Sequence, residues 1–146
     1  MLLISHRGNI NGRKPLEENQ PAYIVSTLAA GYEVEIDVWR EQDKWYLGHD
    51  KPEYLVEGSF LKTDRLWCHA KNLAALELLL DLGVNCFWHQ NDDFTLTTKG
   101  YIWAFPGRPL CAKSICVLPE LTSPTSLSYQ PALCAGICSD FIERYK

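Results

Sequence analysis

The chain has 146 residues, a length typical of one domain, and its composition is 47% apolar and 22% charged. This composition excludes a disordered chain, and 14 basic against 18 acidic residues, for a net charge of −4, argue against a nucleic-acid-binding protein. The sequence contains no apolar stretch of membrane-spanning length, and its start lacks the basic flank and apolar region of a signal peptide. We therefore expect a single domain over residues 1–146, located in the cytoplasm and without stable membrane insertion.

The first half of the chain alternates between predicted strands and helices. Residues 2–5 form a short apolar run, typical of a buried strand, and a polar loop follows it. A helix is expected over 20–30, with Asn19 as its N-cap and Pro21 in its first turn. Residues 32–39 alternate with a period of two, which indicates a strand. Further strands are predicted at 45–47, 66–70, 84–88, 101–105, 114–118 and 135–139, with a helix between Asn72 and Gly83, one helical turn within 93–99 and a loop over 122–130.

This order of elements predicts an α/β fold with a parallel sheet, because parallel neighbours need a crossover connection between them. A closed eight-stranded barrel takes about 250 residues, so length by itself favours an open sheet. Of the six cysteines, four lie within apolar stretches and are expected to be buried and reduced: Cys68, Cys86, Cys116 and Cys138.

The first candidates for chemistry are the four histidines, each at or next to the end of a predicted strand: His6, His49, His69 and His89. In parallel α/β folds the carboxyl ends of the strands meet at one edge, so these side chains could converge there. The alternative is that they are separate solvated or core residues.

A second candidate is the acidic face of the strand at 32–39, where Glu33, Glu35 and Asp37 alternate with apolar residues. If this face is enclosed, the like charges repel and lose hydration, and a hard divalent cation would stabilise them. If the face is half-exposed, the acids are simply solvated, and the spacing does not decide between the two.

Two cations accompany these groups. Arg7 follows His6, and Lys71 lies two residues after His69, on the same face of its strand. Together with the acids and histidines they suggest an anionic substrate, although each could also form an ordinary surface ion pair. A metal, two fixed cations and two imidazoles are the parts needed to cleave a phosphodiester.

Four short motifs carry a resemblance to a known family. They are Ile4-Ser-His-Arg-Gly8, Glu18-Asn-Gln-Pro21, Glu35-Ile-Asp-Val38 and Leu47-Gly-His-Asp50, and their order and spacing resemble the N-terminal signature of the glycerophosphodiester phosphodiesterases. Trp67-Cys-His-Ala-Lys71 occupies the place of the family's Glu-x-Lys strand, and Ala135-Gly-Ile-Cys-Ser-Asp140 is similar to its last barrel strand.

The resemblance implies a compact TIM-like (β/α) barrel with several outer helices reduced or missing. It also implies metal-dependent hydrolysis of a glycerophosphodiester, or a related small phosphodiester, to an alcohol and a phosphomonoester. The implied site consists of the acid/base pair His6 and His49, the phosphate-binding Arg7 and Lys71, and the metal ligands Glu35 and Asp37 with Mg²⁺ or Ca²⁺.

Two features depart from the family pattern. His69 stands where the family has a third acidic ligand, and an imidazole in that position makes Mn²⁺ or Zn²⁺ possible instead. The chain is also about 100 residues shorter than a typical barrel, which would leave outer strand faces uncovered. We therefore expect a homo-oligomer, with 134–141, 115–118 and the aromatic residues Tyr101, Trp103 and Phe105 as candidates for the covered surface.

Two other functions are compatible with the same residues. One is a catalytically silent phosphate-binding module, in which His69 marks a lost metal site; retention of both His6 and His49 argues against it. The other is a phospholipase D-like enzyme of the same superfamily, but the sequence contains no basic amphipathic helix for a membrane surface.

Overall fold

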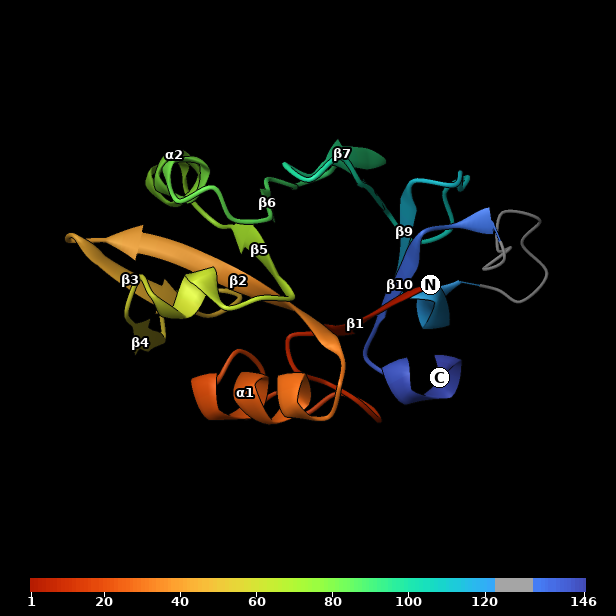
Figure 1. Cartoon of the computed structure of the whole chain (residues 1–146), viewed down its shortest axis with the longest axis horizontal. Helices are drawn as coiled ribbons and strands as arrows, with labels where there is room; N and C mark the ends of the chain where they lie inside the picture. Colours follow the sequence, from red (N-terminus) through yellow and green to blue (C-terminus); the bar gives the residue numbers. More distant parts are fainter. Residues whose placement is uncertain (123–132) are drawn as a thin grey trace.

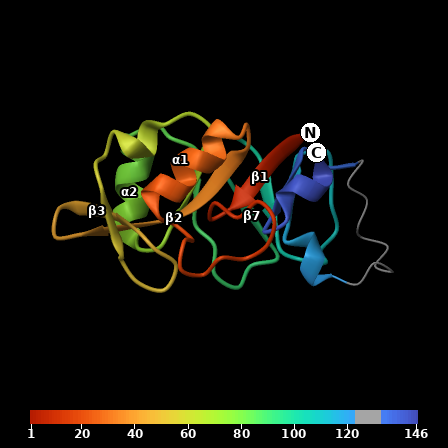
Figure 2. The same ribbon diagram turned by 90° about the horizontal axis from the view of Figure 1, so that it is seen from below.

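The computed structural model describes residues 1–122 and 133–146, and in these residues a single mixed sheet of ten strands curls around an interior (Figure 1). Seven strands run parallel to their neighbours in the spatial order β6-β5-β2-β1-β10-β9-β8. They are β1 (Leu2–His6), β2 (Glu33–Glu41), β5 (Leu66–Ala70), β6 (Cys86–Phe87), β8 (Ile102–Ala104), β9 (Ser114–Val117) and β10 (Gly136–Ser139). Strand β1 pairs with β10, so the first and last strands lie side by side in the middle of the sheet and the two termini lie close together (Figure 2).

Three antiparallel strands extend the sheet. The second half of β2 pairs with β3 (Lys44–Leu47), and β3 pairs with β4 (Tyr54–Val56). At the other end of the sheet, β7 (Phe94–Leu96) pairs with β8. The sheet therefore combines a parallel centre with two antiparallel hairpin extensions.

Two short helices cover the outer face of β2 and β5. Helix α1 (Pro21–Ala29) follows β1, and α2 (Leu73–Asp81) follows β5 and begins at Asn72, whose side chain accepts a hydrogen bond from the Ala75 amide. The two helices and the β3-β4 hairpin enclose an apolar core with the outward side chains of β2, among them Val34, Ile36 and Val38. The alternation along β2 thus separates an apolar outer face from an acidic inner one.

The expectation of a TIM-like (β/α) barrel was wrong. Between β2 and β5 the chain forms the β3-β4 hairpin and a single 3₁₀ turn at Phe60–Lys62, and between β6 and β9 it forms another hairpin and loops, so helices do not alternate with strands. Within the described residues β6 pairs only with β5, and one backbone hydrogen bond from Thr98 N to Cys86 O (3.0 Å) links it to the segment after β7. Hairpins and 3₁₀ turns therefore occupy the positions where an alternating barrel has crossover helices.

Three local expectations also need correction. The helical turn predicted within 93–99 is strand β7, and the short strand β4 was not foreseen. Gln20 is the N-cap of α1, whereas Asn19 adopts a positive φ of 62° and uses its side chain elsewhere. Apart from Thr122, the loop predicted over 122–130 lies outside the described residues.

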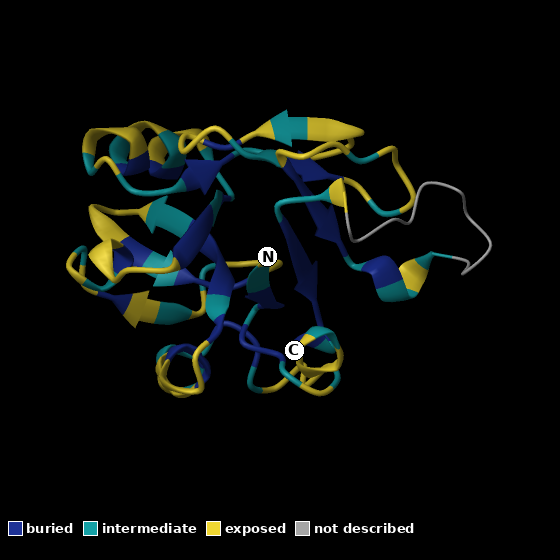
Figure 3. Cartoon of the chain, turned by 45° about the vertical axis from the view of Figure 1, so that its right-hand side comes forward, coloured by how far each residue is buried: buried dark blue, intermediate teal, exposed yellow. Residues whose placement is uncertain are grey.

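The interior of the curled sheet is filled by large aromatic side chains. The rings of Trp67, Phe87 and Trp103 are buried and pack with centroids 4.6 to 5.8 Å apart. Figure 3 shows the buried strands at the centre and the exposed residues at the periphery. The aromatic cluster closes the inside of the sheet below the strand ends that carry the histidines.

Most of the surface expected to be covered by a partner is already covered by the chain itself. The inward side chains of β8, β9 and β10 belong to the interior cluster, and the C-terminal 3₁₀ turn Ile142–Tyr145 packs on the outer face of β9 and β10. Of the aromatic candidates Trp103 is buried, whereas Phe105 is 45% exposed. Self-association stays a prediction. None of the helices in residues 1–122 and 133–146 has the length and hydrophobicity needed to cross a bilayer.

The packing of α2 predicts a large difference between two adjacent leucines. Leu79 is completely buried against β2 and β5, and Leu80 is 53% exposed. We expect Leu79→Ala to lower the free energy of unfolding by about 2–5 kcal/mol, because it leaves a cavity. We expect Leu80→Ala to change it by less than about 0.5 kcal/mol. Urea unfolding of the two variants measures both values, and equal losses would contradict the proposed packing.

Candidate functional site

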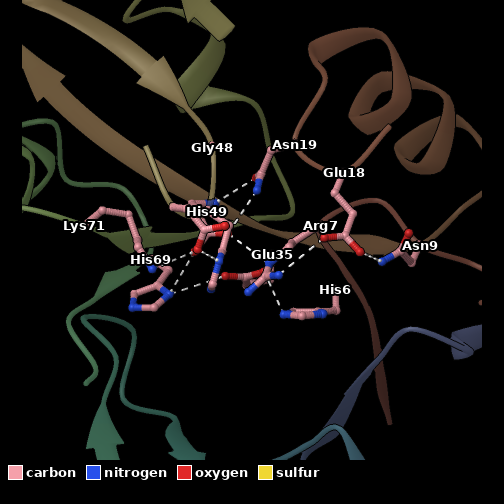
Figure 4. Close-up of polar contacts among 12 residues, drawn as sticks. His6, Arg7, Asn9, Glu18, Asn19, Glu35, Gly48, His49, His69 and Lys71 are labelled. Atoms are coloured by element: carbon pink, nitrogen blue, oxygen red, sulfur yellow. Dashed lines mark hydrogen bonds and ion pairs between the residues drawn. The ribbon is translucent and has the colours of Figure 1, made fainter. Parts of the chain in front are cut away.

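The four histidines converge, as predicted, on one pocket of about 390 Å³ at the carboxyl ends of the parallel strands. Its polar side is lined by His6, Arg7, Glu35, His49, His69 and Lys71, which come from β1, β2, β5 and the adjoining loops. Asp37 is fully buried beneath these residues and contacts several of them. The seven residues proposed from the sequence therefore lie together at one site, and Figure 4 labels all of them except Asp37.

Strand register explains the convergence. His6 on β1 is the register partner of Glu35 on β2, and Asp37 on β2 is the partner of His69 on β5. Because side chains at paired positions of neighbouring strands lie on the same face, all four point to the inside of the sheet. Glu33 lies on the same face farther from the pocket, where its carboxylate accepts a hydrogen bond from Trp67 Nε1 at 2.6 Å.

Asp37 is the centre of the cluster. Its Oδ2 lies 3.0 Å from Arg7 Nε, and its Oδ1 lies 3.2 Å from His69 Nδ1 and 3.4 Å from Lys71 Nζ. Asn19 Nδ2 donates to Oδ2 at 2.9 Å, and Asn19 Oδ1 accepts from the backbone amide of Asp37. From the sequence, Asn19 was expected to cap a helix. Its left-handed backbone conformation instead directs both the Nδ2 and the Oδ1 of its side chain to Asp37.

The charges in this cluster shift two pKa values in opposite directions. Burial disfavours the charged form of Asp37 and would raise its pKa. The interactions of the carboxylate with His69, Arg7 and Lys71 have a larger effect in the opposite direction, so the pKa of Asp37 lies well below its usual value. Burial also disfavours the charged form of His69, but the attraction of Asp37 and Glu35 for its proton has a larger effect and raises the pKa of His69 to about 9. His69 is therefore an imidazolium at neutral pH unless another cation replaces its proton.

His6 is held by the carboxylate of Asp140, a residue that was not among the site residues predicted from the sequence. Its Nδ1 lies 2.8 Å from Oδ1 of Asp140, the residue directly after β10. Asn9 donates to the same oxygen at 2.8 Å, and Glu120 accepts from the Asp140 amide at 2.8 Å. Because a carboxylate only accepts, the Nδ1 of His6 carries the proton, and Nε2 is left as the acceptor in the neutral ring. In the sequence, Asp140 was marked by its position at the end of a predicted strand and by its place in the Ala135-Gly-Ile-Cys-Ser-Asp140 motif.

His49 lies on the loop after β3 and is more open to solvent than the other pocket histidines, with 43% of its side chain exposed. Its Nδ1 is 2.7 Å from Oδ1 of Asp50, so its tautomer is fixed in the same way as that of His6. Gly48 before it has φ 148°, and a Cβ at this position would overlap the carbonyl oxygen of Lys51. The turn that places His49 at the pocket therefore requires glycine.

Glu18 connects the N-terminal loop to the cluster. Its carboxylate accepts from Asn9 Nδ2 at 3.0 Å and from Arg13 Nε at 3.2 Å, and it lies 3.4 Å from Arg7 Nη1. Burial raises the pKa of Glu18, but these donors and cations lower it below the usual value. Arg7 is thus fixed between two carboxylates, Asp37 and Glu18.

Three side chains could hold a metal ion. One ligand atom each of Glu35, Asp37 and His69 lies within 4.8 Å of the others, which is close enough for a shared ion. Within the described residues, Oε2 of Glu35 and Oδ1 of Asp37 are buried without a well-oriented hydrogen bond. Buried polar atoms are normally paired, so these oxygens fit the role of metal ligands. Two carboxylates and an imidazole suit Mn²⁺ or Zn²⁺ as well as Mg²⁺ or Ca²⁺.

Charge balance agrees with an exchange between a proton and a metal ion. Four carboxylates (Glu18, Glu35, Asp37 and Asp140) contact the permanent cations Arg7, Arg13 and Lys71 and the protonated His69. A divalent ion that displaced the His69 proton would leave the cluster with a net positive charge. Such a site would attract an anion.

Comparison of the chain with models of protein families, with curated proteins and with solved structures finds no match.

The ion pair of His69 with Asp37 predicts an unusual titration. In the metal-free protein we expect the imidazole of His69 to titrate near pH 9, and its pKa to fall toward 6.5 in Asp37→Asn. Because the folded pKa lies above 6.5, the pair's contribution to stability is complete below pH 6.5 and is lost as the pH rises through about 9. NMR titration of the histidine ring protons measures this, and a midpoint at or below 6.5 for His69 would contradict the ion pair.

Proposed function

We propose that the protein is a metal-dependent phosphodiester hydrolase that converts a glycerophosphodiester, or a related small phosphodiester, to an alcohol and a phosphomonoester. The main support is that two histidines, His6 and His49, line one pocket with the Glu35-Asp37-His69 cluster, and each has its Nδ1 fixed by a carboxylate. Paired imidazoles with defined tautomers are suited to moving protons at both ends of a scissile bond.

Phosphate binding falls to Arg7 and Lys71. Both line the pocket, and each has donors beyond those directed at carboxylates, since a guanidinium offers five N–H groups and an ammonium three. Their contacts with Asp37 hold them in place before the substrate arrives. Fixed cations of this kind stabilise the charge that develops on the phosphoryl oxygens.

Glu35, Asp37 and His69 would hold the metal ion. Bound there, a divalent ion would act as a Lewis acid that neutralises negative charge on the phosphate. The protein's own contribution is to bury the two carboxylates, so that they need a cation, and to supply an imidazole that gives up its proton when the ion binds.

The proton transfers are assigned by the surroundings of the two histidines. Nε2 of His6 takes a proton from the attacking water, and Asp140 stabilises the imidazolium that forms. As the water oxygen bonds to phosphorus, the P–O bond to the alcohol breaks, and the protonated His49 gives its proton to the departing oxygen. The more exposed position of His49 suits this role, because the released alcohol leaves toward solvent and the ring regains its proton there.

One observation favours a second candidate, a metal-free phosphate-binding module. Asp37 already has three cationic partners, and its charge is balanced without a metal ion. In this case Arg7 and Lys71 would bind phosphate, and no diester would be cleaved.

We further propose that the protein is cytoplasmic, forms a homo-oligomer and has no nucleic-acid partner. The negative net charge of the chain argues against a nucleic-acid partner. The support for a homo-oligomer is the exposed apolar surface that remains, such as Phe105, which is 45% exposed.

The function is tested by ³¹P NMR of metal-stripped protein with a pool of glycerophosphodiesters, with Mg²⁺, Ca²⁺, Mn²⁺ or Zn²⁺ added separately. We expect conversion to a phosphomonoester with at least one ion. We also expect His6→Ala and His49→Ala each to lower kcat by about 10²–10⁴-fold, because each removes one proton transfer.

Two readouts separate the candidates. Circular dichroism and inorganic phosphate binding of both variants should match those of the wild type, which shows that the fold and Arg7 and Lys71 are intact. Phosphate binding without conversion by any ion would exclude the hydrolase and support the binding module. Full activity in either variant would exclude the assigned proton transfers.

His69→Glu tests the ligand set. A third carboxylate replaces the imidazole, so we expect the order of metal affinities to shift from Mn²⁺ or Zn²⁺ toward Mg²⁺ or Ca²⁺. Isothermal titration calorimetry of the metal-stripped protein with each ion measures the shift. Unchanged relative affinities would show that His69 is not a ligand.

A further inference from the structure

The wall of the pocket opposite the histidine cluster is made almost entirely of apolar side chains. It is formed by Trp103, Phe105, Pro106, Val117, Leu118 and Leu121, from β8, β9 and the segments that follow them. The polar wall comes from β1, β2 and β5 on the other side of the curled sheet. The two walls therefore belong to different halves of the sheet, and the proposed phosphate site lies where they meet.

The outer part of this wall is open to solvent. Phe105 is 45% exposed and Leu121 is 70% exposed, although both line the pocket. Contiguous apolar surface at the mouth of a pocket is unfavourable in water and typical of a ligand-binding surface.

The backbone of the segment that carries part of this apolar wall adopts an unfavourable conformation at Leu118. Leu118 has φ 44° and ψ 56°, a left-handed conformation that is rare for a residue without a short polar side chain. Its amide donates to Cys138 O at 2.7 Å, which ties the turn to β10. The 3₁₀ turn Pro119–Leu121 begins directly after it and carries Leu121 to the pocket. Strain of this kind persists where neighbouring contacts fix it, often at ligand sites.

A second, smaller pocket of about 170 Å³ adjoins the first one and shares Arg7 and His49 with it. Its other lining residues are mostly charged or polar, namely Arg13, Glu18, Asn19, Asp50, Lys51 and Glu53. Donors and acceptors at this density suit a hydroxylated group and not a hydrocarbon. A group bound at Arg7 therefore has a polar pocket on one side and an apolar wall on the other.

We propose that the substrate is an asymmetric phosphodiester, in which one alcohol is a small polyol that occupies the polar pocket and the other is a hydrocarbon alcohol that packs on the wall of Phe105 and Leu121. The inference rests on the proposed function for its phosphate site, and it adds the chemical class of the second alcohol and the part of the pocket that each alcohol occupies. Continuity of the apolar wall with the pocket that holds Arg7 and Lys71 identifies the occupant as part of the same ligand.

The test uses two glycerol phosphodiesters of equal charge and chain length, one with a hexyl group and one with a diethylene glycol chain as the second alcohol. We expect the hexyl ester to have the higher kcat/KM, and the lower Kd by calorimetry, by about 10-fold, since buried methylene groups are favourable and buried ether oxygens are not. Calorimetry is performed with the metal-stripped protein as well, so that binding is measured whether or not turnover occurs.

Two pairs of variants test whether the preference for the hexyl ester arises at the apolar wall. Phe105→Ala and Leu121→Ala remove apolar surface from the wall, and each should lower the ratio of the hexyl to the glycol kcat/KM at least about 3-fold. The matched controls are Phe94→Ala and Leu96→Ala on β7, since these residues are 46% and 70% exposed and lie outside the pocket. The controls should keep the wild-type ratio.

The outcomes of the two proposals are distinguishable. Hydrolysis of both esters with equal kcat/KM and equal Kd would overturn the asymmetric substrate and leave the hydrolase intact. Binding with a hexyl preference but no hydrolysis would support the apolar subsite and overturn the hydrolase. If Phe105→Ala lowers the molecular mass in light scattering without changing the ester ratio, the wall is a contact between copies of the chain, and the inference is wrong.

Discussion

The site depends on the burial of one carboxylate. Asp37 lies on the inner face of β2 with no solvent exposure, and a buried charge is tolerated only when opposite charges and hydrogen bonds surround it. Arg7, His69 and Lys71 supply the charges, and Asn19 supplies the hydrogen bonds. These groups come from three separate segments of the chain, so satisfying Asp37 also brings together His69 and the two cations that the proposed chemistry needs.

The same constraint explains how a small sheet can carry this site with few helices. Parallel pairing of β1, β2 and β5 places His6, Glu35, Asp37 and His69 in register, and the connections between these strands contain a single α-helix, α1, because β2 is joined to β5 by the β3-β4 hairpin and a 3₁₀ turn. Elsewhere the chain uses hairpins and 3₁₀ turns to cover the sheet. Below the site, Trp67, Phe87 and Trp103 fill the interior and exclude water, which strengthens the electrostatic interactions above them.

His6 and His49 differ in their exposure to solvent because the carboxylates that contact them lie in different parts of the fold. Asp140 holds His6 from β10, a strand far away in sequence, and Asn9 and Glu120 hold Asp140 in turn. His49 is held by its neighbour Asp50 on an exposed loop, where Gly48 allows the turn. One imidazole is therefore rigid and enclosed, and the other is accessible to solvent, which gives the two ends of a scissile bond different surroundings.

The sequence by itself determined the local features of the protein. The period of two in β2 separated Glu35 and Asp37 from the apolar face, and the strand ends marked all four histidines, because side-chain direction in a strand follows from position alone. The cap of α2 at Asn72 was equally local.

Only the tertiary structure decided what depends on contacts between distant segments. The connections from β2 to β5 and from β6 to β9 formed hairpins where an alternating barrel was expected, since a strand of three residues such as β7 is stabilised by its neighbour β8 and not by its own sequence. Asn19 donates a hydrogen bond to Asp37, 18 residues away, and does not cap α1. Asp140 contacts His6, which is 134 residues away in the sequence. The division of the pocket into a charged and an apolar wall likewise arises from the curl of the sheet, which brings β1, β2 and β5 to face β8 and β9.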